Sequence, residues 1–187
     1  MRSKTGFTKS LAVGAVLAVG LLTAGPASAQ TGGAAAPGSV PPAPSTTVPG
    51  GKAKLLKNGK AIPPAGAPSQ VVAAIEAGNR IRKKPYRYGG GHASFEDTGY
   101  DCSGAVSYLL GAAGLLSSPM PSGPMMSLGE PGKGRWFTVF AHGGHAYMTV
   151  AGLRFDTSAM GSGGNGPRWR RTKRSAKGFT VRHPSGF

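Results

Sequence analysis

The cysteine at position 102 is the only one in the chain, and its surroundings favour chemistry over packing. It lies in the Tyr-Asp-Cys-Ser-Gly segment over 100–104, directly before an apolar run. If that run forms a helix, Cys102 lies in its first turn, where unpaired N–H groups and the positive end of the helix dipole stabilise a thiolate. The competing interpretation is a small buried hydrophobic side chain, which is common for a free cysteine.

A cysteine nucleophile needs a base, and His145 is the best candidate among four histidines. Alternating apolar residues over 145–150 predict a half-buried strand that begins at this histidine. If Ala151-Gly152 forms a two-residue turn, the next strand over 153–158 places Asp156 on the same face, as the diagonal neighbour of His145. Asp156 would then orient the imidazole. A three-residue turn would put Asp156 on the opposite face, so the register tests the assignment.

The remaining histidines do not form a convincing metal site. His142 lies three residues before His145, and Cys102 is a third potential ligand. A structural zinc ion needs four well-placed ligands and a catalytic one usually three, so we expect no metal, and we expect no organic cofactor. We expect His142 in a glycine-rich turn, and His92 and His183 as surface or structural residues.

Two helices are needed to position these residues. Ser69 is a candidate N-cap for an amphipathic helix whose apolar positions are Val71, Val72, Ile75 and Ile81. The cysteine helix has helical apolar spacing at Ala105, Val106, Leu109, Leu110 and Ala113, and Gly114 is placed to end it. Between the two helices, three glycines over 89–91 allow the chain to pack tightly against the start of the cysteine helix.

The later part of the chain is predicted to form strands. Aromatic and β-branched residues over 134–140 predict a strand that pairs with the one beginning at His145, and 179–182 is a candidate last strand. The intervening segment 115–132 is a loop rich in Pro, Gly and Met. Its methionines indicate surface packing, with a flexible rim over a groove as the alternative. These elements together predict an α+β domain.

The amino-terminal region has the pattern of an exported protein. Residues 1–29 combine three basic residues, an apolar stretch over 11–22 and Ala27-Ser28-Ala29, which is typical of a signal peptide cleaved near Ala29. The apolar stretch is about a dozen residues, too short for a bilayer-spanning helix of roughly 20. We therefore expect a secreted or wall-associated protein without a transmembrane anchor.

The mature chain divides into a linker and one domain. Residues 30–68 are rich in Pro, Ala and Gly and predict a disordered linker, although a short ordered arm over 52–62 stays open. Residues 69–187 are enough for one domain with a single core, and we expect a monomer. The sequence contains no internal repeat and no sign of a second module.

The chain is strongly basic, with a formal net charge of +16. Removal of the leader leaves 19 basic and 6 acidic residues, a net charge of +13. Many of the charges gather late, between Arg168 and Lys177. An exported protein of this charge is attracted to polyanions such as anionic wall polymers, unless the charges only keep a loop solvated. A nucleic-acid partner is not expected, because no recognition motif accompanies the charge.

Three segments together resemble the NlpC/P60 family of cell-wall cysteine peptidases. They are Pro-Tyr-Arg-Tyr-Gly-Gly over 85–90, Tyr-Asp-Cys-Ser-Gly over 100–104 and Gly-His-Ala-Tyr-Met over 144–148. The resemblance covers most of 69–160. It implies a papain-like fold, with the cysteine helix packed on a small antiparallel sheet, and hydrolysis of an amide bond in peptidoglycan stem peptides.

The resemblance also implies roles for single residues. Cys102 is the expected nucleophile and His145 the base, while Asp156 stands where the family most often has a histidine. Tyr86 would line the site and stabilise the oxyanion. Asp101 and Ser103 match positions that hold the free amino group of a stem peptide.

Two departures from the family pattern keep an alternative open. Asp156 replaces the usual histidine, and the segment before the base lacks the Gly-Asp that usually leads its strand. The alternative is a catalytically inactive wall-binding module with the same fold.

Overall fold

The four strands predicted in the second half of the chain assemble with two unpredicted ones, β3 and β7, into one antiparallel sheet in the order β3-β8-β4-β5-β6-β7. The structure is a computed structural model that describes residues 51–158 and 165–187. In chain order the strands are β3 (Glu130–Pro131), β4 (Phe137–His142), β5 (His145–Val150), β6 (Leu153–Asp156), β7 (Arg168–Arg170) and β8 (Thr180–His183).

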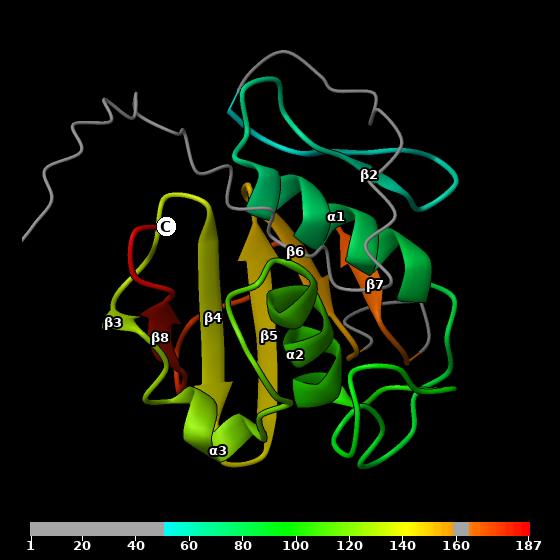
Figure 1. Cartoon of the computed structure of the whole chain (residues 1–187), viewed down its shortest axis with the longest axis vertical. Helices are drawn as coiled ribbons and strands as arrows, with labels where there is room; N and C mark the ends of the chain where they lie inside the picture. Colours follow the sequence, from blue (N-terminus) through cyan, green and yellow to red (C-terminus); the bar gives the residue numbers. More distant parts are fainter. Residues whose placement is uncertain (1–50, 159–164) are drawn as a thin grey trace, which may run out of the picture. The chain divides into compact units, whose positions relative to one another are not determined.

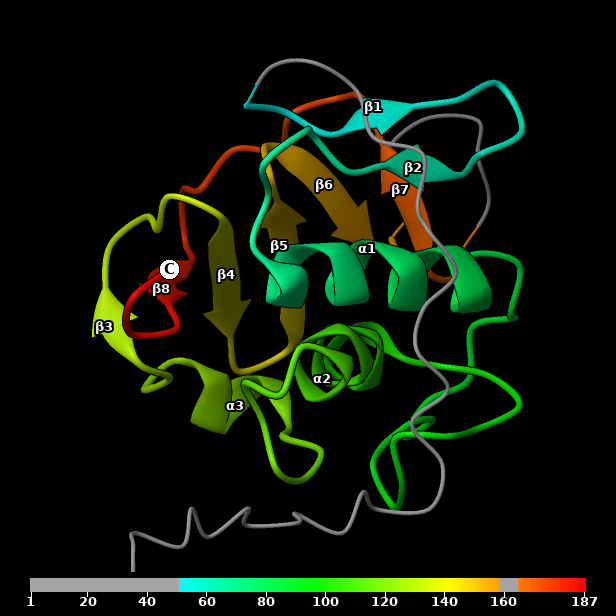
Figure 2. The same ribbon diagram turned by 45° about the horizontal axis from the view of Figure 1, so that its top comes forward.

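Helices α1 (Ser69–Ile81) and α2 (Cys102–Ala112) cover one face of this sheet, as Figures 1 and 2 show. The strand residues that face the helices are apolar and buried, among them Val139, Met148 and Phe155. A small antiparallel sheet with helices on one side confirms the α+β prediction.

Helix α1 begins one residue earlier than its predicted cap implies. Pro68 occupies the N-cap position and Ser69 is already helical, with no side-chain cap bond. The prediction of Ser69 as N-cap is therefore wrong by one position, because the fixed φ of proline leads the chain into the helix without a hydroxyl. The buried face includes Gly78, where a Cβ would lie 2.4 Å from the Trp169 ring.

A short hairpin precedes α1 and is tied to it. Strands β1 (Lys54–Leu55) and β2 (Ala61–Ile62) pair antiparallel, and the backbone of Ala61 exchanges two hydrogen bonds, of 2.7 and 2.8 Å, with the Asn79 side chain on α1. The hairpin lies within the range 30–68 that the sequence predicts as linker. The ordered chain therefore begins before Ser69, as the alternative of a short arm allows.

The turn between β5 and β6 has the predicted length. Val150 pairs with Leu153, which leaves Ala151 and Gly152 as a two-residue turn, both with positive φ. Such turns match the twist of the strands they join. The register places His145 and Asp156 on the same face of the sheet, which confirms the strand pairing on which their assignment depends.

The loop predictions need two corrections. His142 is the last residue of β4 and pairs with His145, so it does not lie in the turn. The predicted loop over 115–132 contains the short helix α3 (Ser122–Met125) and β3. Met125 is fully buried in the core whereas Met126 is exposed, so the methionines serve mainly in packing.

Within the described ranges, none of the helices has the length and apolar character needed to cross a bilayer. The predicted signal peptide over 1–29 and the linker as far as residue 50 lie outside those ranges.

Candidate active site

Cys102 is the first residue of α2 and opens onto a cavity. Asp101 caps the helix, with its carboxylate accepting a 2.8 Å hydrogen bond from the Gly104 N–H. Cys102 is 9% exposed and lines a cavity of about 250 Å³. Burial raises the pKa of the Cys102 thiol, but hydrogen bonds with His145 and the Ala146 N–H outweigh it, and the net pKa is lowered. The thiol is therefore poised to ionise.

His145 links the thiol to a buried carboxylate. Its Nε2 lies 3.1 Å from Oδ1 of Asp156, which leaves Nδ1 of the same ring for Cys102. Burial lowers the pKa of His145, yet hydrogen bonds with Asp156 and Cys102 raise it to about 9. The structure thus brings together the three residues that the sequence singles out for catalysis.

Asp156 is held ionised by its neighbours. Burial raises its pKa, but the hydrogen bonds with His145 and the Ser158 N–H, with a further bond from Arg174, lower it to about 2. The Ser158 hydroxyl adds a hydrogen bond of 3.0 Å. A buried carboxylate that accepts this many bonds keeps its charge at any pH where the protein would work.

Arg174 is a member of this cluster that the sequence reasoning missed. Its Nη1 lies 3.0 Å from Oδ2 of Asp156 and 3.2 Å from Nε2 of His145, and it donates to the Ser158 hydroxyl. The guanidinium also lies over the Tyr147 and Phe179 rings. The only sequence signal was the late cluster of basic residues, which gave no hint that one of them turns toward the base.

The glycine-rich segment before α2 packs directly on the helix start, as its glycines predict. A Cβ on Gly104 would lie 1.9 Å from the Gly90 carbonyl oxygen, so only glycine fits there. The Asp101 N–H donates to that same carbonyl at 3.2 Å. This close contact fixes the wall of the cavity beside Cys102.

A second polar cluster lies in the cavity wall. Nε2 of His92 is 2.9 Å from Oδ2 of Asp101 and 3.0 Å from the Ser103 hydroxyl, and that hydroxyl donates to Asp101. His92, expected at the surface or in a structural role, is thus a cavity residue. Its position directly after the three glycines was the signal available in the sequence.

Aromatic and backbone groups complete the cavity. Tyr86 and the 94% exposed Tyr88 line it on one side, and Pro121, Ser122, Gly143 and Gly144 on the other. Burial and the neighbouring Cys102 and Asp101 raise the pKa of Tyr86, so its hydroxyl stays a hydrogen-bond donor. The N–H groups of Cys102 and Ser103, two residues that line the cavity, lie in the first turn of α2 and have no acceptor within the helix.

The described ranges contain no cluster of three or more His, Cys, Asp or Glu side chains arranged to hold a metal ion. A scan against protein-family models and a search of curated proteins gave no match to this chain.

Proposed function

We propose that this protein is a cysteine peptidase that hydrolyses an amide bond through Cys102, His145 and Asp156. The observation that carries the proposal is the continuous hydrogen-bonded chain from a thiol with a lowered pKa, through the imidazole, to a buried carboxylate, at the wall of an open cavity. We infer a papain-like fold of the NlpC/P60 type from the cysteine at the start of a helix and the histidine at the start of a strand in the facing sheet.

In the proposed mechanism the Cys102 thiolate attacks the carbonyl carbon and forms a tetrahedral intermediate. N–H groups at the start of α2 and the Tyr86 hydroxyl stabilise its oxyanion. Protonated His145 then gives its proton to the leaving amine, and an acyl-enzyme thioester results. Water, deprotonated by His145, attacks the thioester, the carboxylic acid product is released, and the Cys102 thiolate and protonated His145 are restored. Asp156 keeps the imidazole oriented and stabilises its charged form.

We propose that the substrate is a peptidoglycan stem peptide with a free amino group. Asp101 is the only acidic residue among those that line the cavity, so the cavity favours a cationic end of a peptide. The Ser103 hydroxyl beside it offers a second contact. The resemblance of the three sequence segments supports this substrate class, as does the predicted export.

The proposal is tested by incubating purified cell wall and defined stem peptides with the protein. Release of new amino groups is expected from the wild type, and none from Cys102→Ala or His145→Gln. His183→Gln is the matched control, because His183 lies on β8 beside Glu130 and away from the cavity. Wall binding without cleavage by any of these proteins would instead support an inactive binding module.

A further inference from the structure

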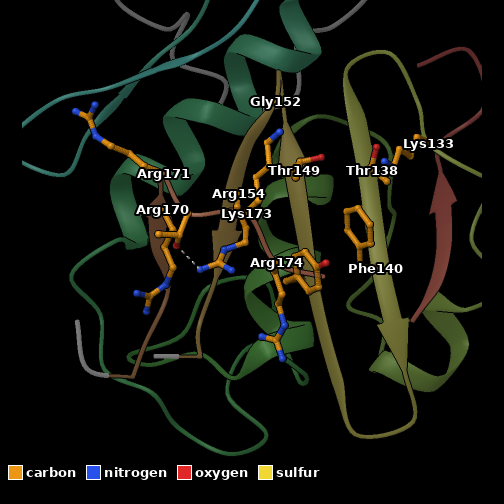
Figure 3. A pocket seen from close by; sticks show the side chains of 12 residues that line it. Lys133, Thr138, Phe140, Thr149, Gly152, Arg154, Arg170, Arg171, Lys173 and Arg174 are labelled. Carbon is orange, nitrogen blue, oxygen red and sulfur yellow. Dashed lines mark hydrogen bonds between the residues drawn. The ribbon is translucent and has the colours of Figure 1, made fainter. Parts of the chain in front are cut away.

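A second pocket lies on the face of the sheet opposite the helices. It is a cavity of about 240 Å³ between the outer side chains of β4, β5 and β6 and the chain over 170–174 (Figure 3). Six of its lining residues are cationic and none is acidic: Lys133, Arg154, Arg170, Arg171, Lys173 and Arg174. Thr138, Thr149 and Thr172 add hydroxyl groups.

The positive charge of this pocket is partly buried. Arg154 is only 3% exposed, and its pKa is lowered by burial and by the charge of Arg174, against the effect of Asp156. Arg170 has a lowered pKa through burial and through Arg154 and Arg168. Grouped guanidinium charges that repel one another at a poorly solvated site are stabilised by an anion.

Two hydrogen bonds to neutral acceptors help to hold the pocket in shape. Arg154 Nη2 donates to the Thr172 hydroxyl at 3.2 Å, which ties the segment to β6, and Arg171 Nη2 donates to the Leu55 carbonyl at 2.6 Å, which ties it to β1. Among the residues that the structure describes, the side chains of Lys133 and Lys173 make no hydrogen bond or ion pair and lie exposed at the rim.

We propose that this pocket binds a phosphate group, either a free phosphate ester or a phosphodiester of an anionic polymer. Several guanidinium and ammonium donors with hydroxyls around one cavity suit the multiple oxygens of a phosphate. Asp156, the carboxylate nearest to these cations, is already bonded to His145, Ser158 and Arg174 and does not line the cavity. Asp156 also lies 3.8 Å from Nε of Arg154, but its single negative charge is smaller than the charge of the six cations that line the pocket, so the pocket attracts an external anion.

Arg174 belongs both to this pocket and to the cluster around His145. A phosphate bound between the cations thus lies one side chain away from the candidate catalytic base. Binding itself requires no catalysis, so the two proposals fail independently.

The test is isothermal titration of the purified protein, and of Cys102→Ala, with inorganic phosphate, glycerol phosphate oligomers, acetate and phosphatidylglycerol vesicles. Saturable 1:1 binding of phosphate is expected. The exposed pair Lys133→Gln/Lys173→Gln should weaken it about tenfold, and 0.5 M NaCl should weaken it further. The control pair Lys60→Gln/Lys177→Gln, of the same charge change outside the pocket, should change it less than about twofold.

Each alternative outcome decides the question. If the oligomers bind more tightly than inorganic phosphate, the proposal is supported and the natural ligand is a polymer. If the two bind equally, the proposal is supported and the natural ligand is a free phosphate ester. Equal weakening by the two lysine pairs, acetate binding as tight as phosphate, binding to vesicles alone, or the absence of saturation would overturn the proposal.

Discussion

At the scale of single residues, the charge state of the site is set by two shifts in opposite directions. Hydrogen bonds lower the pKa of Cys102, while Asp156 and Cys102 raise the pKa of His145 to about 9. Both shifts favour the pair of thiolate and protonated imidazole over the pair of thiol and neutral imidazole. They therefore favour an activated nucleophile.

The pH profile follows from these shifts. Alkylation of Cys102 by iodoacetamide should reach its plateau below the usual pH for a thiol, whereas hydrolysis should fall as pH rises through about 9, because deprotonated His145 cannot protonate the leaving amine. Asp156→Asn should move that upper limit to lower pH and reduce kcat by roughly 10²-fold or more. An unmoved upper limit in this variant would contradict the assignment of Asp156.

The proposed amine recognition depends on the charge of Asp101. Asp101→Asn keeps an N-cap acceptor for the Gly104 N–H but removes the charge, together with the oxygen that accepts from the Gly89 N–H at 3.1 Å. For a peptide with a free amino terminus, KM should rise about 10-fold, since a charge-assisted hydrogen bond is worth roughly 1.5–3 kcal/mol. For the same peptide with an acetylated terminus, KM should hardly change. Equal effects on both peptides would show that Asp101 acts only through the helix.

At the scale of elements, the sequence predicted the parts of the site that depend on periodicity. The alternation over β5 and the small residues at Ala151-Gly152 fixed the register that brings His145 to Asp156, and the apolar spacing placed Cys102 at the start of α2. His92 and Arg174 escaped prediction because they lie in irregular segments that only tertiary packing positions. The β1–β2 hairpin was obscured by its proline-rich flanks.

The close contact between the glycine-rich segment over 89–91 and α2 can be tested by substitution. Alanine normally stabilises a helix relative to glycine, but at Gly104 its Cβ would lie 1.9 Å from the Gly90 carbonyl oxygen. Gly104→Ala should therefore destabilise the protein by about 1–3 kcal/mol and slow Cys102 alkylation, because the helix start must move. In the control Gly123→Ala, in α3, nothing lies within 4 Å of the new Cβ. Urea denaturation of both variants measures the difference.

At the scale of the whole molecule, residues far apart in sequence meet at one side chain. Asn79 on α1 bonds both backbone groups of Ala61 in β2, and its Oδ1 also accepts a hydrogen bond of 3.1 Å from the Trp169 indole N–H on β7. The hairpin, the first helix and the far edge of the sheet are therefore joined by one amide. That edge carries Arg170, which lines the proposed phosphate pocket, so this part of the pocket wall is tied to the same junction.

Replacement of the Asn79 side chain should lower the stability of the protein, because it breaks contacts of α1 with both β2 and β7. Asn79→Ala removes three hydrogen bonds and leaves the Trp169 N–H, on a ring that is 95% buried, without its acceptor, so unfolding should become easier by about 2–4 kcal/mol. The matched control is Asn58→Ala in the exposed hairpin turn, where a single bond to the Lys60 N–H is lost and the cost should stay below about 1 kcal/mol. Thermal unfolding followed by tryptophan fluorescence compares the two. Equal effects would mean that the hairpin contributes to stability only through its own turn and does not couple α1 to β7.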